Sequence, residues 1–353
     1  MSLDSDIGCV AIGRNEGERL DRCLRSLGCG GGAADAPGAG PRSTCVYVDS
    51  GSSDGSVELA RALGAHVVKL DLTTPFTAAR ARNAGFRALI EVAPATAFVQ
   101  FVDGDCEVAP GWLARARRRL DERPELAVVC GRRRERFVAR SVYNRLCDIE
   151  WDTPVGPARA CGGDALVRRS AFEQVGGFDP GLIAGEEPEL CVRLRAAGHG
   201  IERLDAEMTL HDAAMSRFSQ WWTRTVRSGH AYAEGAALHG APPERHFVRE
   251  YRRAWLWAAA LPVLALGGAI PTLGASLGLL GGYPVSAWRV YRHVRRRGRT
   301  PRDAAVAGVF TTIGKFPELQ GILRYHATRL RGRRSGLIEY KGGGAVAGQA
   351  DRR

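Results

Sequence analysis

The sequence predicts an α/β protein built on a mostly parallel sheet with helices on both faces. Short apolar runs of strand type alternate with segments of helical spacing between residues 7 and 130, a pattern typical of βαβ units. Residues 98–102 are apolar on both faces of the expected strand, and the turn Asp103-Gly104-Asp105 follows them directly. Open α/β sheets bind their ligands at the carboxyl ends of the strands, so this acidic turn marks the expected site.

The remaining elements follow at the spacing that such a sheet requires. Asp54 stands where an N-cap is expected, and the segment 28–43 is rich in Gly, Ala and Pro and is expected to be a loop. No internal repeat is visible. In chain order we expect strands at 7–12, 44–48, 66–70, 98–102 and 127–130, and helices at 18–27, 54–63, 77–90 and 111–120.

The charge of the chain narrows the classes of partner. A net charge of +12 and a pI near 9.7 suit nucleic acid, an anionic membrane surface or a phosphorylated substrate. Much of the positive charge lies from Arg289 onward and flanks an apolar stretch, which favours a membrane over nucleic acid. No zinc finger and no basic sheet interleaved with aromatic residues is visible in the sequence, so we expect no nucleic-acid partner.

The cysteines indicate a reducing compartment. The nine cysteines form no C-x-x-C pair, so zinc binding and thioredoxin-like chemistry are not expected. Cys9, Cys45 and Cys130 lie in apolar runs and are expected in the core, as in a cytosolic protein. The N-terminal residues carry Asp4 and Asp6 and lead into a strand, so no signal peptide is expected.

Asp103 and Asp105 are the main candidates for a metal site. Two carboxylates one residue apart repel each other, and a cation beside them relieves that cost. Mg²⁺ and Mn²⁺ favour carboxylate oxygens and keep positions open for phosphate oxygens, while Gly104 permits a tight turn between the two aspartates. An ordinary acidic turn after a strand is the alternative.

A Gly/Ser-rich turn, Ser-Gly-Ser-Ser-Asp-Gly, directly follows Asp49 at the end of the second expected strand. Gly51, Ser53 and Gly55 fit the nucleophile elbow of hydrolases, with His211 later in the chain, but that elbow requires more sheet before it. We prefer a turn whose backbone approaches a nucleotide, with Asp49 bonding to the base or ribose. A plain tight turn is the third possibility.

An acidic cluster opens the helix expected after residue 185. Glu186, Glu187 and Glu189 stand in its first turn, with Pro188 at a position that helix starts favour. Glutamates there complement the helix dipole. A carboxylate at a helix start that faces a pocket can also act as a general base toward a hydroxyl group.

Taken in this order, the motifs resemble those of the family 2 inverting glycosyltransferases, which have the nucleotide-diphospho-sugar transferase (GT-A) fold. The resemblance runs from about residue 7 to about residue 224, and the joint order of the motifs makes it specific. The matching segments are Asn15-Glu16, Asp49-Ser50-Gly51-Ser52-Ser53-Asp54-Gly55, Ala81-Arg82-Asn83-Ala84-Gly85, Asp103-Gly104-Asp105, Gly162-Gly163, Val175-Gly176-Gly177-Phe178-Asp179 and Glu186-Glu187.

The resemblance implies a mechanism and a role for each matching residue. A Mg²⁺ or Mn²⁺ ion stabilises the departing nucleoside diphosphate as a Lewis acid. A carboxylate base deprotonates the acceptor hydroxyl, which attacks from the opposite face and inverts the anomeric centre. The implied donor contacts are Ala11, Glu16, Asp49, Arg82 and Asp103, the metal ligands are Asp105, Asp103 and His211, and the acceptor contacts are Gly162, Gly163, Asp164, Trp221 and Trp222.

The chain departs from the family pattern at two places. The family has Glu-Asp where this chain has Glu186-Glu187; Glu187 aligns with the Asp and is the first candidate for the base, and Glu186 is the second. Processive members carry Gln-x-x-Arg-Trp, whereas residues 220–224 hold these residue types in a different order, so processivity is not expected. Trp221 and Trp222 would then lie on a helix that faces the acceptor or the membrane, or they would pack in the core. His211 either completes the metal site or has a structural role.

The last third of the chain suggests contact with a membrane. No charged residue occurs from Ala254 to Trp288, while arginines stand on both sides of this stretch, which favours a hairpin with both ends in the cytoplasm. A buried helix pair in a soluble domain is the alternative. The expected division is a catalytic domain at 1–235, an apolar helical segment with basic flanks at 236–300, an amphipathic basic helix at 301–340 and a disordered tail at 341–353.

The sequence as a whole predicts a metal-dependent inverting glycosyltransferase at the cytoplasmic face of the cell membrane. It would move a sugar from a nucleotide-diphosphate donor to a hydroxyl of a glycan, glycolipid or lipid-linked acceptor, as in cell-surface or exopolysaccharide biosynthesis. A nucleotidyltransferase of related fold is a second possibility, although the first strand lacks the expected glycine-rich, lysine-containing loop. A non-catalytic sugar-nucleotide-binding scaffold at the membrane is the third.

Overall fold

The computed structural model describes residues 6–30, 43–332 and 338. The tail predicted at 341–353 and most of the loop predicted at 28–43 lie outside the described residues. The chain divides into two compact units, one formed by residues 1–138 and 147–213 and the other by residues 139–146 and 214–353. The predicted catalytic boundary at residue 235 falls inside a helix of the second unit.

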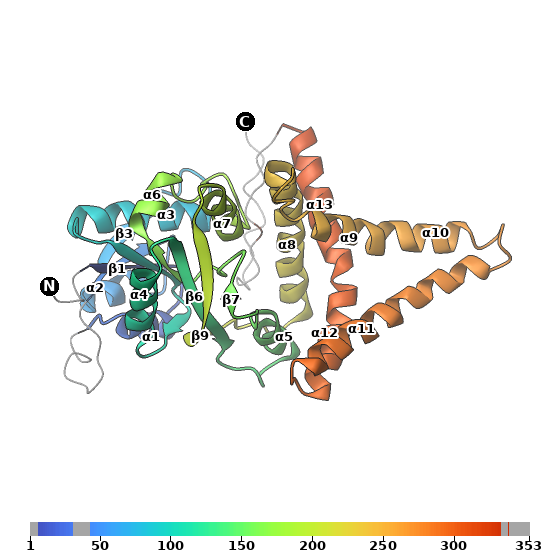
Figure 1. The fold of residues 1–353 in the computed structure, drawn as a ribbon, viewed down its shortest axis with the longest axis horizontal. Helices are drawn as coiled ribbons and strands as arrows, with labels where there is room; N and C mark the ends of the chain where they lie inside the picture. Colours follow the sequence, from blue (N-terminus) through green and yellow to red (C-terminus); the bar gives the residue numbers. More distant parts are fainter. Residues whose placement is uncertain (1–5, 31–42, 333–337, 339–353) are drawn as a thin grey trace. The chain divides into compact units, whose positions relative to one another are not determined.

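The first unit is a single sheet covered by helices (Figure 1). Its strand order is β3-β2-β1-β4-β8-β6-β9-β5, with β7 paired to β9. All five strands predicted between residues 7 and 130 are present, the last one longer than predicted. The strands are β1 (Ile7–Gly13), β2 (Thr44–Asp49), β3 (His66–Lys69), β4 (Phe98–Asp103), β5 (Cys106–Val108), β6 (Leu126–Glu135), β7 (Gly156–Pro157), β8 (Ala165–Arg168) and β9 (Gly200–His211).

The sheet is mixed, which corrects the prediction of a mostly parallel one. Four of the eight strand pairings among the described residues are parallel and four are antiparallel. Two of the antiparallel pairings come from β8, which enters the sheet between β4 and β6, and the other two join β9 to β5 and β7. The three strands β1, β2 and β4 remain parallel, so their carboxyl ends meet at one edge.

The helices of the first unit, except α6, which was not predicted, lie close to the predicted positions. They are α1 (Glu18–Ser26), α2 (Ser56–Ala62), α3 (Ala78–Val92), α4 (Trp112–Glu122), α6 (Arg169–Gln174) and α7 (Glu186–Ala196), and α5 (Val142–Glu150) crosses the boundary between the two units. The second helix starts at Ser56 rather than at residue 54, and the Asp54 carboxylate accepts a hydrogen bond from the Ser56 N–H.

The core lies between the sheet and its helices. Strands β1 and β4 are buried along nearly their whole length, so residues on both faces are covered, as predicted for β4. Cys9, Cys45 and Cys130 are buried in this core, as predicted. Gly85 lets α3 lie directly on the sheet, since a Cβ there would overlap side chains of β1 and β2.

The second unit is helical. A long helix, α8 (Phe218–His239), packs along α13 (Lys315–Leu330). The single helix predicted over 301–340 is two helices, α12 (Pro301–Ile313) and α13, which meet at Gly314. Pro317 lies just after this break and cannot donate to the helical hydrogen-bond ladder, which accounts for the interruption.

A helical hairpin extends from the second unit (Figure 1). Its outgoing leg runs without a break through α9 (Val248–Trp255), a π-helical turn (Leu256–Ala260) and α10 (Leu261–Gly267). The second leg of the hairpin consists of a 3₁₀ segment (Ala275–Gly281) and α11 (Gly282–Arg296). Among the described residues, no helix has the length and hydropathy needed to cross a membrane.

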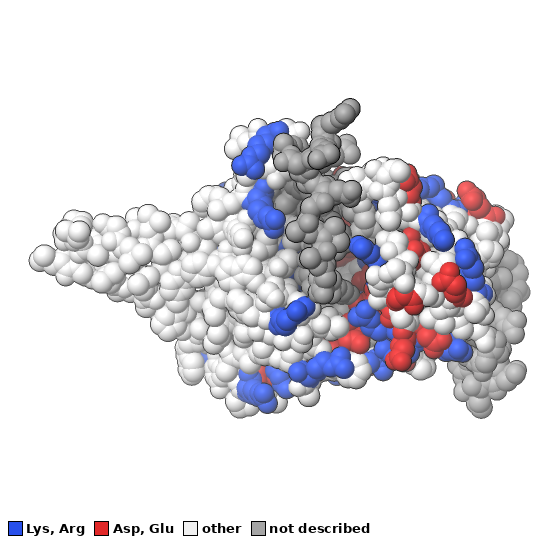
Figure 2. Space-filling model, turned by 180° about the vertical axis from the view of Figure 1, so that it is seen from behind, with Lys and Arg blue, Asp and Glu red and all other residues white. Residues whose placement is uncertain are grey.

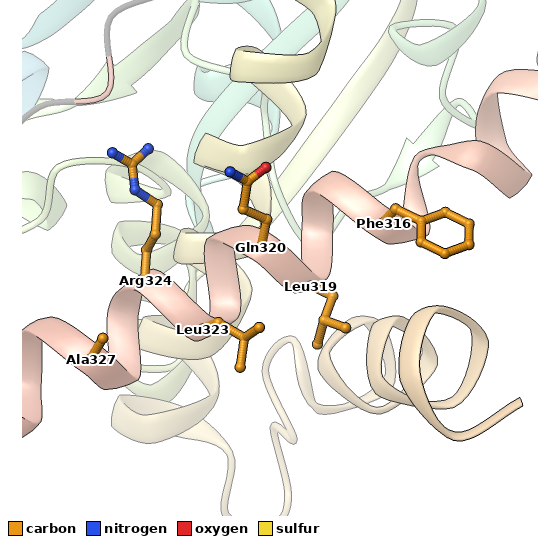
Figure 3. Close-up of a pocket in the computed structure, with 6 residues that line it drawn as sticks. All are labelled: Phe316, Leu319, Gln320, Leu323, Arg324 and Ala327. Atoms are coloured by element: carbon orange, nitrogen blue, oxygen red, sulfur yellow. The ribbon is translucent and has the colours of Figure 1, made fainter. Parts of the chain in front are cut away.

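A shallow pocket of about 390 Å³ lies along one face of α13 (Figure 3). Its lining is mostly apolar and comes from this helix alone, and it contains none of the residues predicted to bind the donor or the metal. The lining residues are Phe316, Leu319, Gln320, Leu323, Arg324 and Ala327.

Candidate functional site

The carboxyl ends of three parallel strands form one edge of the sheet in the first unit. Ile12 of β1 pairs with Asp103 of β4, and Gly13 of β1 pairs with Asp49 of β2. Both predicted aspartates are therefore held at the same level by backbone pairing. Ala11, one residue earlier in β1, is buried below them.

The loops after β1 and β2 are bonded to each other. The Asn15 N–H donates to Ser52 Oγ at 2.9 Å, and the Ser53 N–H donates to Asn15 Oδ1 at 2.8 Å. Asp49 is buried, and its carboxylate accepts from the N–H groups of Gly51 and Ser52, both at 3.0 Å. Hydrogen bonds with Asn15 and with the buried Asp49 carboxylate thus fix the conformation of the Gly/Ser turn.

Arg82 links the acidic turn to the acidic helix start. Its side chain is only 3% exposed, and its two terminal nitrogens donate to Asp103 Oδ1 at 2.7 Å and to Glu186 Oε1 at 2.6 Å. Although burial opposes its charge, Asp103 and Glu186 raise the pKa of Arg82, so it stays protonated. The family resemblance implied that Arg82 contacts the donor, but it did not reveal this bridge.

Asp105 pairs with His211, whose strand β9 lies beside β5. Asp105 Oδ2 is 3.2 Å from His211 Nε2, and both side chains are buried. Glu135 Oε2 approaches the other ring nitrogen, Nδ1, at 3.8 Å, and the Trp151 ring lies edge-on to the imidazole with centroids 4.6 Å apart. Asp103, by contrast, points toward arginines, so the two aspartates of the motif have different partners.

Asp164 lies beneath the acidic turn rather than at its surface. It is fully buried, and it accepts hydrogen bonds from the Asp103 N–H at 3.2 Å and from Thr209 Oγ1 at 2.9 Å. Arg133 Nη2 is 2.7 Å from its second oxygen and 3.9 Å from Asp103 Oδ2. Asp164 therefore holds the turn, and its predicted contact with the acceptor remains a prediction. The neighbouring Gly162 is exposed.

Glu187 faces two cysteines. Its Oε1 accepts hydrogen bonds from the Cys161 N–H at 2.5 Å, from the Cys161 thiol at 2.9 Å and from the Cys191 thiol at 3.0 Å. All three contacts end on the same oxygen, and Oε2 has no partner among the residues that the structure describes. The pKa of Cys191 is raised by its hydrogen bond with Cys161, by burial and by the Glu187 charge.

Glu16 and the two tryptophans complete the set of predicted residues. Glu16 pairs with Arg19 at 2.9 Å in the first turn of α1, beside the Asn15 loop. Trp221 and Trp222 belong to α8 of the second unit. Trp221 is buried against Phe310, with ring centroids 4.9 Å apart, and the Trp222 indole N–H donates to Gln320 Oε1 at 2.7 Å.

Sequence reasoning missed the residues that position this site. Arg133, Glu135, Thr209 and Trp151 lie on strands or loops with no motif of their own, so only the sheet pairing brings them together. Asn83 is an exception, because its motif was recognised: its side chain exchanges hydrogen bonds with the Phe178 backbone at 2.7 and 3.0 Å, which joins α3 to the Gly-Gly-Phe-Asp segment.

The fold and the site define a class of α/β protein in which charged side chains gather at the carboxyl ends of parallel strands. Residues 10–176 match the model of glycosyl transferase family 2. This segment, 167 of the 353 residues, therefore carries a glycosyltransferase family 2 domain. This result favours the transferase interpretation over the hydrolase elbow and the nucleotidyltransferase.

Comparisons with known proteins agree on this class. The pre-mycofactocin glycosyltransferases of two Mycobacterium tuberculosis strains, CDC 1551 / Oshkosh and H37Rv, are each 31% identical over 207 residues, 55% of this chain. The match spans 42% of the length of those relatives. The solved mannosyltransferase PcManGT from Pyrobaculum calidifontis, in complex with GDP-Man and Mn²⁺, superposes with a TM-score of 0.57 at 17% identity, covering 92% of this chain and 88% of that one. At this identity the likeness shows a shared fold.

Proposed function

We propose that the chain is a metal-dependent inverting glycosyltransferase that moves a sugar from a nucleotide-diphosphate donor to a hydroxyl group. One observation carries the proposal: the buried Asp105–His211 pair lies at the strand edge where the Asp103–Arg82–Glu186 bridge also ends. This arrangement supports a cation site beside the charged network, at the edge where open α/β sheets bind their ligands. The solved relative with Mn²⁺ and a nucleotide sugar supports the same chemistry.

The donor atoms of the Asp105–His211 pair fit a divalent cation. Two neighbouring ligands of an octahedral ion, each about 2.1 Å from it, lie about 3.0 Å apart. The observed separation of Oδ2 and Nε2 is 3.2 Å. Glu135 beside Nδ1 would keep the ring oriented with Nε2 toward the ion. A bound Mg²⁺ or Mn²⁺ would stabilise the negative charge of the departing diphosphate.

Arg82 prepares the donor site without competing for the diphosphate. Its charge is matched by Asp103 and Glu186, so it fixes the position of both carboxylates rather than offering a free cation. Asp103, whose side chain is 29% exposed, would accept a hydrogen bond from the ribose. Asp49 and the rigid Gly/Ser turn would contact the base, with Ala11 and Glu16 near the nucleoside.

Glu187 is the proposed base. Because three donors converge on Oε1, the carboxylate is held in place while Oε2 can accept the proton of an acceptor hydroxyl. Glu186 is the alternative, but its Oε1 is occupied by Arg82. Gly162 and Gly163 lie next to Cys161 and would admit the acceptor to this side, with Asp164 beneath them. Trp221 and Trp222 are proposed as further acceptor contacts.

The test is release of nucleoside diphosphate from a panel of UDP-, GDP- and dTDP-sugars, with and without Mn²⁺ and with a membrane extract as acceptor. We expect metal-dependent release from one donor, and loss of release in Asp105→Ala. The control is Asp121→Ala, which removes an exposed carboxylate of α4. Metal-dependent donor binding without release from any donor would point to a missing acceptor, whereas neither binding nor release would favour the scaffold. Equal activity of Asp105→Ala would refute the metal site.

A pair of variants separates the two glutamates. We expect Glu187→Gln to lose transfer to the acceptor while it still binds the donor, because the amide cannot accept the proton. Glu186→Gln should weaken donor binding, because Arg82 would lose one of its two carboxylate partners, but the variant should keep some transfer activity. Full transfer by Glu187→Gln together with none by Glu186→Gln would reverse the assignment.

We further propose that the helical hairpin docks on the cytoplasmic surface of an anionic membrane. Its two legs lie together, since Tyr283 donates to the Trp257 carbonyl at 2.6 Å and Ser276 donates to the Ala265 carbonyl at 2.7 Å. The turn between the legs is strongly exposed: Ile270 is 90% exposed and Leu273 is 98% exposed. Figure 2 shows this end of the hairpin free of Lys, Arg, Asp and Glu.

The size of the hairpin supports insertion into one leaflet. From Ala254 to Gly267 the outgoing leg has 14 uncharged residues, which at 1.5 Å per residue reach about 21 Å beyond Arg253. The hydrocarbon core is about 30 Å thick, so the leg passes the headgroups and ends inside the bilayer. Arg252 and Arg253 on one leg and Arg289 on the other would then meet anionic headgroups.

Vesicle flotation tests the docking. We expect the chain to float with phosphatidylglycerol-containing vesicles, in part even at high salt, and Ile270→Asp/Leu273→Asp to lose the salt-resistant part. Leu238→Asp, an exposed leucine of α8, is the matched control and should bind as the wild type does. Complete release by high salt would refute insertion. A dimer that Ile270→Asp/Leu273→Asp makes monomeric, without vesicle binding, would show that a second copy covers the hairpin.

A further inference from the structure

Two cysteines and a glutamate that are distant in sequence form a compact ligand cluster in the first unit. Cys161 precedes β8, whereas Glu187 and Cys191 lie one helical turn apart on α7. The two thiol sulfurs are 4.0 Å apart, and each lies within 3.0 Å of Glu187 Oε1. The three ligand atoms thus face one another at the centre of the cluster.

We propose that this cluster binds one borderline or soft divalent cation of the zinc class, through the two thiolates and the Glu187 carboxylate. The consequence for activity rests on the proposed function: a cation there occupies the proposed base and inhibits sugar transfer. The site is separate from the Asp105–His211 pair, which offers a carboxylate and an imidazole beside the single thiol of Cys106, whereas this cluster offers two thiols.

The distances fit such an ion with small adjustments. Two thiolates at about 2.3 Å from a tetrahedral Zn²⁺ lie about 3.8 Å apart, close to the observed 4.0 Å. A thiolate and a carboxylate oxygen on the same ion lie about 3.6 Å apart. The carboxylate would therefore move outward by about 0.6 Å from its present hydrogen-bonding distance.

Binding would replace the two thiol–carboxylate contacts with bonds to the cation. At present each thiol hydrogen is shared with Glu187 Oε1. When the cation binds, both thiols lose their protons to solvent, the two S–metal bonds and one O–metal bond form, and the fourth position is left for water. Cys161 is half-buried beside the exposed Gly162, which gives an ion access, whereas Cys191 is fully buried.

The test measures zinc retained by the full chain, without donor or acceptor. The protein is kept reduced with a phosphine, and excess Mg²⁺ is present to occupy harder sites. We expect one equivalent of Zn²⁺ per chain, release of protons on binding, and thiolate-to-metal absorption when Cd²⁺ is used instead. Cys161→Ala and Cys191→Ala should retain none. Cys147→Ala, a buried cysteine outside the cluster, should retain one equivalent, and Asp105→Ala likewise.

The outcomes separate this site from the proposed function. Zinc retention that is equal in wild type and Cys191→Ala, or absent in both, overturns the site, provided thermal melts show that the variants fold. Zinc retention without inhibition of sugar transfer, in an otherwise active enzyme, leaves the site intact and refutes Glu187 as the base. A wild type that retains zinc, and that shows no transfer with any donor even after the zinc has been removed and Mn²⁺ added, supports the site and counts against the proposed function.

Discussion

Removing the Arg82 guanidinium should destabilise the first unit by about 3 kcal/mol. Arg82→Met keeps the length and apolar character of the side chain but leaves Asp103 and Glu186 without a cation. Breaking a buried ion pair costs about 3–5 kcal/mol because a charge is left uncompensated. Asp103 is 29% exposed and Glu186 is 11% exposed, so water screens part of the loss and the lower figure applies.

Native-state hydrogen exchange is the suitable assay because it reports on the first unit alone. The amides of β1 and β4 lie at the centre of the sheet, so their exchange follows opening of that unit. A loss of about 3 kcal/mol corresponds to exchange about a hundredfold faster. Arg87→Met is the matched control, since Arg87 lies on the exposed face of the same helix and should change stability by less than about 0.5 kcal/mol.

A double variant tests the stated cause. If the loss arises from an unpaired carboxylate, Arg82→Met/Glu186→Gln should recover part of the stability, with a coupling energy of about 0.5–3 kcal/mol. Additive effects of the two substitutions, or exchange in Arg82→Met that matches Arg87→Met, would refute the electrostatic account of this bridge.

Two further predictions concern the second unit. Gly321→Ala should lower the free energy of unfolding by at least about 1–3 kcal/mol, because a Cβ there would overlap the backbone of α8. Gly267→Ala should leave it nearly unchanged, because a Cβ there would meet open space. Urea unfolding compares the two variants. Burial, assisted by Arg324, lowers the pKa of His230 to about 4 and outweighs the Glu234 carboxylate 3.5 Å away. The unfolded chain then binds a proton between about pH 6.5 and 4 that the folded unit does not, so stability should fall by about 1.4 kcal/mol per pH unit as pH decreases; an unchanged slope in His230→Gln would contradict this.

The sequence by itself determined the elements around the acidic turn. Periodicity and turn residues predicted β1 to β4 and the helices between them, because these segments are short, regular and bounded by Gly, Asp or Pro. The order of motifs predicted the family. Asp49 and Asp103 were each predicted at the end of a strand, and the parallel pairing of those strands with β1 brings the two aspartates to one edge.

Only the tertiary structure decided which side chains meet. The antiparallel insertion of β8 made the sheet mixed, and the pairing of β5 with β9 brought His211 to Asp105 across more than a hundred residues. The spacing of the cysteines argued against a metal cluster, yet folding places Cys161 beside Cys191. Local pattern fixes how a segment folds, whereas contacts between distant segments depend on sheet order and packing, which no local pattern encodes.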